Sequence, residues 1–445
     1  MKGGSMLEKM LKKMIFIPLF LVSGIAYNCT ELQTQPEQLG ETSVVKTVRL
    51  LENGVSLTCV DGIQNSGALY RICVPEDWNG ELVVYAHGYV APDEPLAIQD
   101  NEIDGVTISE IINQMGYAFA TSSYRDNGLI IPDAVMDLVE LTDIFSSGYG
   151  DPKHVYLIGA SEGGAVAALG VEQYPGVFDG GLATCGPVGD FKKQIDYFSD
   201  FRVVFDYFFP NMIPGSAVDV PAEVMMNWSS KYEPLIKNAI AANPQATRQL
   251  LRVTRAPVDV RDPKSIESTV IGILWYTVFA TNDAIVKLGG QPFDNLTRIY
   301  SGSGNDLLLN MNIKRFKADD DAVAEIEARY QTSGDLVNPL VTMHTTGDPI
   351  VPYWHEPLYN LKIYQSGNVQ KHFNIPVFRY GHCNFQMSEV LAGFTILVLK
   401  VSLKNLILTE KMIPNPGLRE EINKFSHDFN QQREFMVFQP PGSFQ

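Results

Sequence analysis

The sequence predicts an α/β fold in which a mostly parallel sheet is flanked by helices. Between residues 82 and 184, short apolar runs alternate with segments of helical periodicity, and this alternation indicates parallel strands with helices on both faces of the sheet. The alternation stops after Pro187, a mostly helical block follows, and strand-like runs return at 341–345 and 377–380. We therefore expect one large α/β domain that is interrupted by a helical insertion.

Each element of this prediction has a local basis. Continuous apolar runs predict strands buried on both faces, and they occur at 82–86, 117–121, 154–158, 178–184, 341–345 and 377–380. Apolar residues that recur every three or four positions predict helices, and these segments are 107–115, 132–145, 165–174 and 387–401.

The domain organisation follows from the interruption. A helical block placed after the strand at 178–184 would cover the carboxyl ends of the strands as a cap. We expect five parts: a signal peptide at 1–28, a flexible tether at 29–43, the first part of the α/β core at 44–190, a helical cap at 191–330 and the second part of the core at 331–445.

The N-terminus predicts export. Lysines precede the short apolar run 14–22, which is typical of a secretory signal peptide and too short to span a bilayer comfortably. A buried N-terminal helix is the alternative. Cys29 lies where lipoproteins carry their acylated cysteine, although Asn28 is a poor match for the small residue usual before it. Secretion and a membrane tether through Cys29 both stay open.

Composition excludes some functions. The formal net charge of −17 argues against nucleic acid as a partner, because no basic surplus is present to neutralise phosphates. Export would permit disulfides, and Cys59 and Cys73 flank a turn-rich stretch that favours a bridge between neighbouring strands. Oligomeric state is left open by the sequence.

Residues 155–175 carry the most informative motif. A strand runs into Gly-Ala-Ser-Glu-Gly-Gly at 159–164, and an alanine-rich helix then continues to Pro175. A strand, a tight glycine turn and a helix form the context in which Ser161 would be held outward as a nucleophile. Gly159 and Gly163 would be required because side chains there would collide with the strand and the helix. The alternative is a serine that only caps the helix.

A serine nucleophile needs a histidine base and an acid that orients the histidine. In the expected chain order, Asp348 follows the strand run 341–345 and His382 follows the run 377–380. The alternatives are a turn residue at Asp348 and a loop or capping histidine at His382.

Three other histidines are less suitable. His344 lies within a strand run, His355 follows Asp348 too soon, and His372 precedes the last strand run. The pair His355-Glu356 forms no zinc-binding H-E-x-x-H motif, because Pro357 follows and the second histidine is missing. No nucleotide or flavin motif is present, so we expect neither a metal nor a cofactor.

The reaction also needs donors for a developing oxyanion. One is the backbone N–H of Glu162, and the loop after the strand at 82–86 offers the other from Tyr89, supported by His87 and Gly88. An ordinary turn at 87–89 is the alternative. The Glu162 carboxylate is expected to face solvent, the cap or the first turn of its helix, and to take no part in the chemistry.

The chain resembles the α/β-hydrolase superfamily. The resemblance rests on four motifs, namely HGY at 87, GASEGG at 159, TGDPIVP at 346 and YGHCNF at 380. The resemblance implies a Ser161–His382–Asp348 triad with Tyr89 and Glu162 as oxyanion donors, and serine at 161 excludes a nucleophilic aspartate. His382-Cys383 is similar to the cysteine after histidine of tannases and feruloyl esterases. Those enzymes also carry cysteine before the serine, where this chain has Ala160, so Cys185 is the alternative partner for Cys383.

Together with the predicted signal peptide, the resemblance favours an exported serine hydrolase that cleaves small-molecule carboxylic esters through an acyl-enzyme. Aromatic residues crowd 196–210, and we expect an apolar or aryl acyl pocket under the cap, although Phe198, Phe201 and Phe205 have the spacing of a core stripe. Trp275, Tyr276 and Phe279 could also contribute. A peptidase or amidase, an acyltransferase and a non-catalytic binding protein are the alternative functions.

Overall fold

A computed structural model describes residues 45–50 and 54–402. The predicted signal peptide, the tether with Cys29 and the end of the chain from residue 403 lie outside the described residues.

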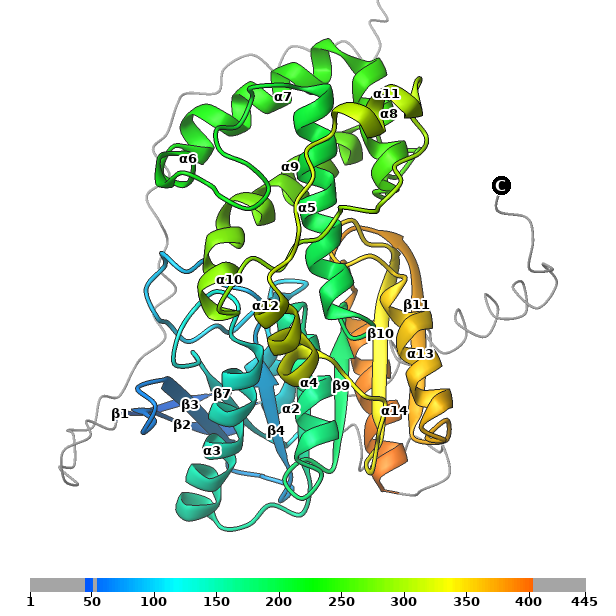
Figure 1. Cartoon of the computed structure of the whole chain (residues 1–445). Coiled ribbons are helices and arrows are strands. Elements are labelled where there is room, and N and C mark those ends of the chain that lie inside the picture. The colour runs from blue at the N-terminus through cyan, green and yellow to red at the C-terminus, as the bar shows by residue number, and fades with distance from the viewer. Residues whose placement is uncertain (1–44, 51–53, 403–445) are drawn as a thin grey trace, which may run out of the picture. The chain divides into compact units, whose positions relative to one another are not determined.

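The described residues contain a nine-stranded sheet, shown in Figure 1. Its strands, in spatial order, are β1 (Val45–Leu50), β2 (Ser56–Ile63), β3 (Leu69–Pro75), β7 (Ala118–Ser122), β4 (Leu82–Ala86), β8 (Val155–Ala160), β9 (Gly180–Thr184), β10 (Leu340–Gly347) and β11 (His372–Tyr380). The six strands from β7 to β11 in this order run parallel, and β1, β2 and β3 join them as antiparallel strands. The predicted, mostly parallel sheet is confirmed.

The antiparallel strands explain the first disulfide. Cys59 of β2 lies directly opposite Cys73 of β3, and their sulfurs are bonded, as predicted. Two short strands, β5 (Glu102–Ile103) and β6 (Val106–Thr107), form a separate hairpin. This hairpin leads directly into α2.

Helices cover both faces of the sheet because alternate strand residues point to opposite sides. Leu82, Val84 and Ala86 of β4 belong to a core with α3 (Ile131–Tyr149), α4 (Glu162–Gln173) and α13 (His355–Gln365). Val83 and Tyr85 belong to a second core with α2 (Ile108–Gln114) and α14 (Met387–Val401). The parallel strands are therefore apolar on both faces.

The chain between β9 and β10 is helical and carries a core of its own. Its elements are α5 (Phe191–Phe208), α6 (Ala222–Met226), η1 (Trp228–Tyr232), α7 (Glu233–Ala242), α8 (Pro244–Thr254), α9 (Lys264–Phe279), α10 (Thr281–Lys287), α11 (Asp306–Asn312), α12 (Asp320–Glu325) and η2 (Ile326–Tyr330). Phe201 and Phe205 are fully buried in this cap core, so they are packing residues.

Two parts of the inserted segment need separate mention. The run 264–287 is long and apolar enough to cross a membrane by composition, but Val270, Ile273 and Leu274 are buried inside the cap core. At the C-terminal end of the inserted segment, Ala322 and Ile326 pack into the core of the sheet instead of the cap core.

Candidate active site

Ser161 occupies a strained turn between β8 and α4. Its backbone has φ 58° and ψ −124°, a left-handed conformation that costs energy for a side chain other than glycine. The serine N–H donates to the Thr184 carbonyl at 2.9 Å, which fixes the turn to the end of β9. A side chain at Gly159 or Gly163 would place its Cβ 2.0 Å from a backbone oxygen, so the close approach of strand and helix requires both glycines.

Asp348 and His382 reach the same turn from the ends of β10 and β11. The His382 imidazole lies 2.8 Å from Ser161 Oγ through Nε2 and 2.7 Å from Asp348 Oδ2 through Nδ1. The Asp348 side chain is fully buried, and its Oδ1 accepts the backbone N–H groups of Ile350 and Val351. The three predicted side chains therefore form one hydrogen-bonded chain.

This arrangement holds Asp348 ionised. Burial by itself raises the pKa of the Asp348 carboxyl, but ionic contacts and hydrogen bonds with His382 and His344 outweigh burial and lower the pKa below its ordinary value. An anionic Asp348 accepts Nδ1–H of His382 and leaves Nε2 free to accept the serine proton. The geometry suits general-base activation of a serine hydroxyl.

The loop after β4 lies against the serine. A Cβ on Gly88 would be 3.2 Å from the Ser161 Cβ. Among the described residues, neither the Tyr89 N–H nor the Glu162 N–H donates a hydrogen bond, as the predicted role of oxyanion donors requires. His87 is buried, stacks on Tyr124 at 4.0 Å and contacts the Gly88 carbonyl through Nδ1 at 2.7 Å. It thereby braces this loop.

Of the three surroundings expected for the Glu162 carboxylate, the structure excludes solvent. The side chain is buried at the start of α4, where its Oε1 accepts the Ile130 N–H at 3.2 Å. Burial raises the pKa of Glu162 to about 8, against the smaller opposing effects of the Ile130 N–H and Lys287. The start of α3 and helix α10 of the cap close over this position, and the sequence alone does not show that packing.

The larger of two cavities that border Ser161 lies away from most of the cap. A space of about 410 Å³ reaches Ser161 and His382 and lies between α2 and α14. Its apolar lining comes from the sheet and these two helices, namely Ile108, Ile111, Ile112, Met115, Ile158, Leu182, Phe385, Met387, Val390, Leu391 and Phe394. Among the described residues of the cap, Tyr276 lines it. The acyl pocket expected under the cap stays a prediction.

A smaller cavity does lie under the cap. It has a volume of about 90 Å³, and Ser161, Glu162, Phe198 and Tyr276 are among the residues that line it. Ser161 and Tyr276 border both cavities. Trp275 lines neither of these two cavities and instead contacts the Tyr89 ring at 6.1 Å.

The second disulfide joins the segment after β9 to the loop that carries His382. Cys185 follows Thr184, which holds the Ser161 turn, and Cys383 follows His382; the two sulfurs are bonded. Both cysteines have positive φ, 45° and 47°, so the backbone is constrained on either side of the bridge. These two cysteines and His382 form a cluster of three residues of metal-binding types, but the disulfide removes the thiolates that would bind an ion.

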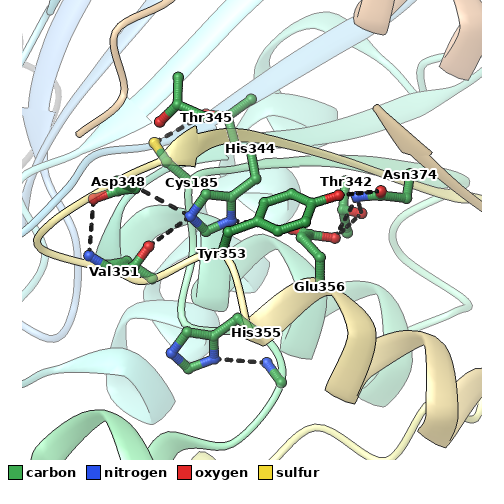
Figure 2. A network of polar contacts seen from close by, with 12 residues as sticks. Cys185, Thr342, His344, Thr345, Asp348, Val351, Tyr353, His355, Glu356 and Asn374 are labelled. Carbon is green, nitrogen blue, oxygen red and sulfur yellow. Dashed lines mark hydrogen bonds and ion pairs between the residues drawn. The ribbon is translucent and has the colours of Figure 1, made fainter. Parts of the chain in front are cut away.

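The other histidines occupy different environments, and Figure 2 shows two of them, His344 and His355. His355 accepts the Gly189 N–H and contacts Gln194, away from the serine. His372 lies against Thr342. His344, which the sequence placed within a strand, lies in β10 beside Asp348 and Glu356. The sequence analysis missed this contact, because Glu356 was considered only as part of a zinc motif.

A mostly parallel sheet with a serine turn after β8, an acid after β10 and a histidine after β11 defines the α/β-hydrolase fold. The chain therefore has the α/β-hydrolase fold. No protein-family model and no curated protein matches it.

Solved structures that match include an esterase from Aspergillus oryzae (13% identity, 82% of this chain and 86% of that chain, TM-score 0.44). Feruloyl esterase B from the same fungus matches with 12% identity over 78% and 80% of the two chains, at a TM-score of 0.41. Candida antarctica lipase A matches with 12% identity over 86% and 90%, at a TM-score of 0.44. The assignment of the fold rests on strand order and the position of the serine turn.

Proposed function

We propose that the protein is an exported serine hydrolase that cleaves carboxylic esters through an acyl-enzyme intermediate. The observation that carries the proposal is the hydrogen-bonded chain from Ser161 through His382 to Asp348, placed at a strained turn that opens into an apolar cavity. Two disulfides support export, because such bonds persist in oxidising compartments. A tether through Cys29 remains part of the proposal.

The proposed reaction has two halves. Ser161 Oγ attacks the ester carbonyl carbon while His382 Nε2 takes the serine proton, and the carbonyl oxygen becomes an oxyanion that accepts the N–H groups of Tyr89 and Glu162. The C–O bond to the alcohol then breaks, and the alcohol leaves with the proton from His382. Water attacks the acyl-enzyme in the same way, returns the proton to Ser161 through His382 and releases the acid.

The two cavities suggest separate positions for the acyl group and the alcohol of the ester. The cavity between α2 and α14 is large and apolar enough for a medium-length alkyl or an aryl acyl group. The smaller space under the cap is placed to receive the alcohol, which leaves toward Phe198 and Tyr276. A small ester is therefore the proposed substrate.

The experiment is hydrolysis of p-nitrophenyl esters from acetate to laurate, with benzoate, by the wild type and Ser161→Ala. Removal of the nucleophile should lower kcat about a thousandfold or more. Wild-type activity on amides but not on esters would favour a peptidase or amidase, and acyl transfer would appear as product formed with an added alcohol. If a fluorophosphonate fails to label Ser161 and no ester is cleaved, the proposal is wrong.

A further inference from the structure

A buried polar network continues beyond Asp348, away from the serine. In Figure 2, His344 lies between Asp348 and Glu356. Its Nδ1 is 3.1 Å from Glu356 Oε1, and its Nε2 is 2.7 Å from the Val351 carbonyl and 3.4 Å from Asp348 Oδ2. All three titratable side chains are 0–1% exposed. A second histidine–carboxylate pair thus backs the first.

The contacts determine the protonation of His344. A backbone carbonyl only accepts hydrogen bonds, so Nε2 must carry a proton toward Val351. Glu356 Oε2 already accepts the Thr342 hydroxyl and the Asn374 amide, which favours the carboxylate form, so Nδ1 also donates. His344 is therefore an imidazolium paired with an anionic Glu356.

The electrostatics of the site agree with this assignment. Burial lowers the pKa of His344, but the hydrogen bonds and ionic contacts with Asp348 and Glu356 outweigh it and raise the pKa to about 10. A histidine that stays charged through neutral pH does not act as a base. It acts instead as a fixed positive charge beside Asp348.

Val351 links this pair to the catalytic acid. Its N–H donates to Asp348 Oδ1, and its carbonyl accepts Nε2–H of His344. His344 thus holds the loop that holds Asp348. The charge on His344 also competes with His382 for Asp348 Oδ2, while Glu356 neutralises His344 from the other side.

We propose that His344 and Glu356 are positioning residues for the reaction proposed above, on which this inference rests. Together they orient Asp348, and their charges determine how readily His382 is protonated. The negative charge of Glu356 offsets the positive charge of His344. The negative charge of Asp348 is therefore not cancelled by His344, and Asp348 can stabilise the His382 imidazolium in the transition state.

Other titratable groups near the network stay neutral around pH 7. The groups facing it from neighbouring elements are Tyr197, Tyr276, Tyr353, His355, Tyr359, His372 and Tyr380. Burial raises the pKa of each of these tyrosines. It also lowers the pKa of His372 to about 4 and that of His355 well below its ordinary value. Among the described residues, the charges of the network are those of Asp348, Glu356, His344 and, when protonated, His382.

The test compares Glu356→Gln with His344→Gln through the acid limb of the pH profile of kcat/KM, which marks protonation of His382. Loss of the Glu356 anion makes that protonation harder, so the limb should move to lower pH, and kcat should fall with little change in KM. Loss of the His344 cation should move the limb to higher pH. We expect shifts of about one pH unit in opposite directions.

His355→Gln is the matched control, because His355 is equally buried and neutral, and its hydrogen bonds go to Gly189, Asp190 and Gln194 and not to Asp348, His344 or Glu356. It should leave the limb in place even if it lowers the melting temperature. Limbs that move in the same direction, or stay in place in both test variants, would overturn the inference and leave only a structural role.

Two readouts separate this inference from the proposed function. The pH dependence of the rate at which a fluorophosphonate labels Ser161 reports the same acid limb without ester turnover. A protein that is labelled but hydrolyses no ester therefore still tests the inference. A wild type that does not label overturns both. In the folded wild type, ¹⁵N spectra of labelled histidine should show both ring nitrogens of His344 protonated where free histidine titrates; a neutral His344 would refute the inference even if the variants fail to fold.

Discussion

The buried carboxyl of Glu162 should make the stability of the protein depend on pH, and Glu162→Gln should remove that dependence. In the folded protein the pKa of Glu162 is raised to about 8 from an ordinary value of 4.5. The glutamine keeps the shape of the side chain and an oxygen to accept the Ile130 N–H. It carries no charge at any pH, so the variant isolates the cost of ionisation.

The magnitude follows from linkage. The raised pKa means that the unfolded chain releases the proton first, so the stability associated with the neutral carboxyl is complete below about pH 4.5 and is lost as pH rises to about 8. Each pH unit in this window costs about 1.4 kcal/mol, and the full loss is on the order of 5 kcal/mol. Above about pH 8 the contribution of Glu162 to the unfolding free energy should no longer change with pH.

The assay is urea unfolding of both proteins from about pH 5 to pH 9, with the difference between their unfolding free energies plotted against pH. Groups other than Glu162 titrate equally in both proteins and cancel in this difference. As pH rises toward about 8, the unfolding free energy of the variant should increase relative to that of the wild type, by several kcal/mol at the alkaline end. A flat difference would refute the assignment of Glu162 as the buried titrating group. Ester hydrolysis should persist in the variant, because the backbone N–H is retained.

Three further results follow from the site. Asp348→Asn should lower kcat about ten-thousandfold with KM nearly unchanged, and steady-state kinetics would show it; a loss below tenfold would contradict the role of Asp348. Cys383→Ala should lower kcat, because the His382 loop loses its bond to β9, whereas Cys73→Ala should lower the melting temperature and spare kcat; equal effects of the two on kcat would argue against the bridge as a support of the site. Leu391→Trp should shift the preferred acyl chain to shorter esters, with each lost methylene costing about 0.8 kcal/mol in kcat/KM; an unchanged chain-length profile would place the acyl group elsewhere.

Local patterns carried much of the fold and the order of the candidate site. Ser161 is surrounded by a strand, glycines and a helix within twenty-one residues, and Asp348 and His382 each follow a strand run. Such features depend on neighbours in the chain, and the structure brings the three side chains into contact.

Features that depend on packing between distant segments were beyond the sequence. The burial of Glu162 depends on α3 and the cap, and the position of the large cavity depends on the spacing between α2 and α14. The pairing of His344 with Glu356 combines a strand with the next helix. No periodicity or motif in the chain encodes these distances.

Helix α5 has a mechanical consequence. Its first residue, Phe191, packs in the core of the sheet, while Phe201 and Phe205 near its other end are buried in the cap core. A single continuous helix is a stiff rod that is clamped at both ends, so it transmits any tilt of the cap to the sheet instead of absorbing it. At this connection the two parts behave as one rigid frame. We therefore expect any change in the shape of the larger cavity to come from side chains and from residues 101–104, which include β5.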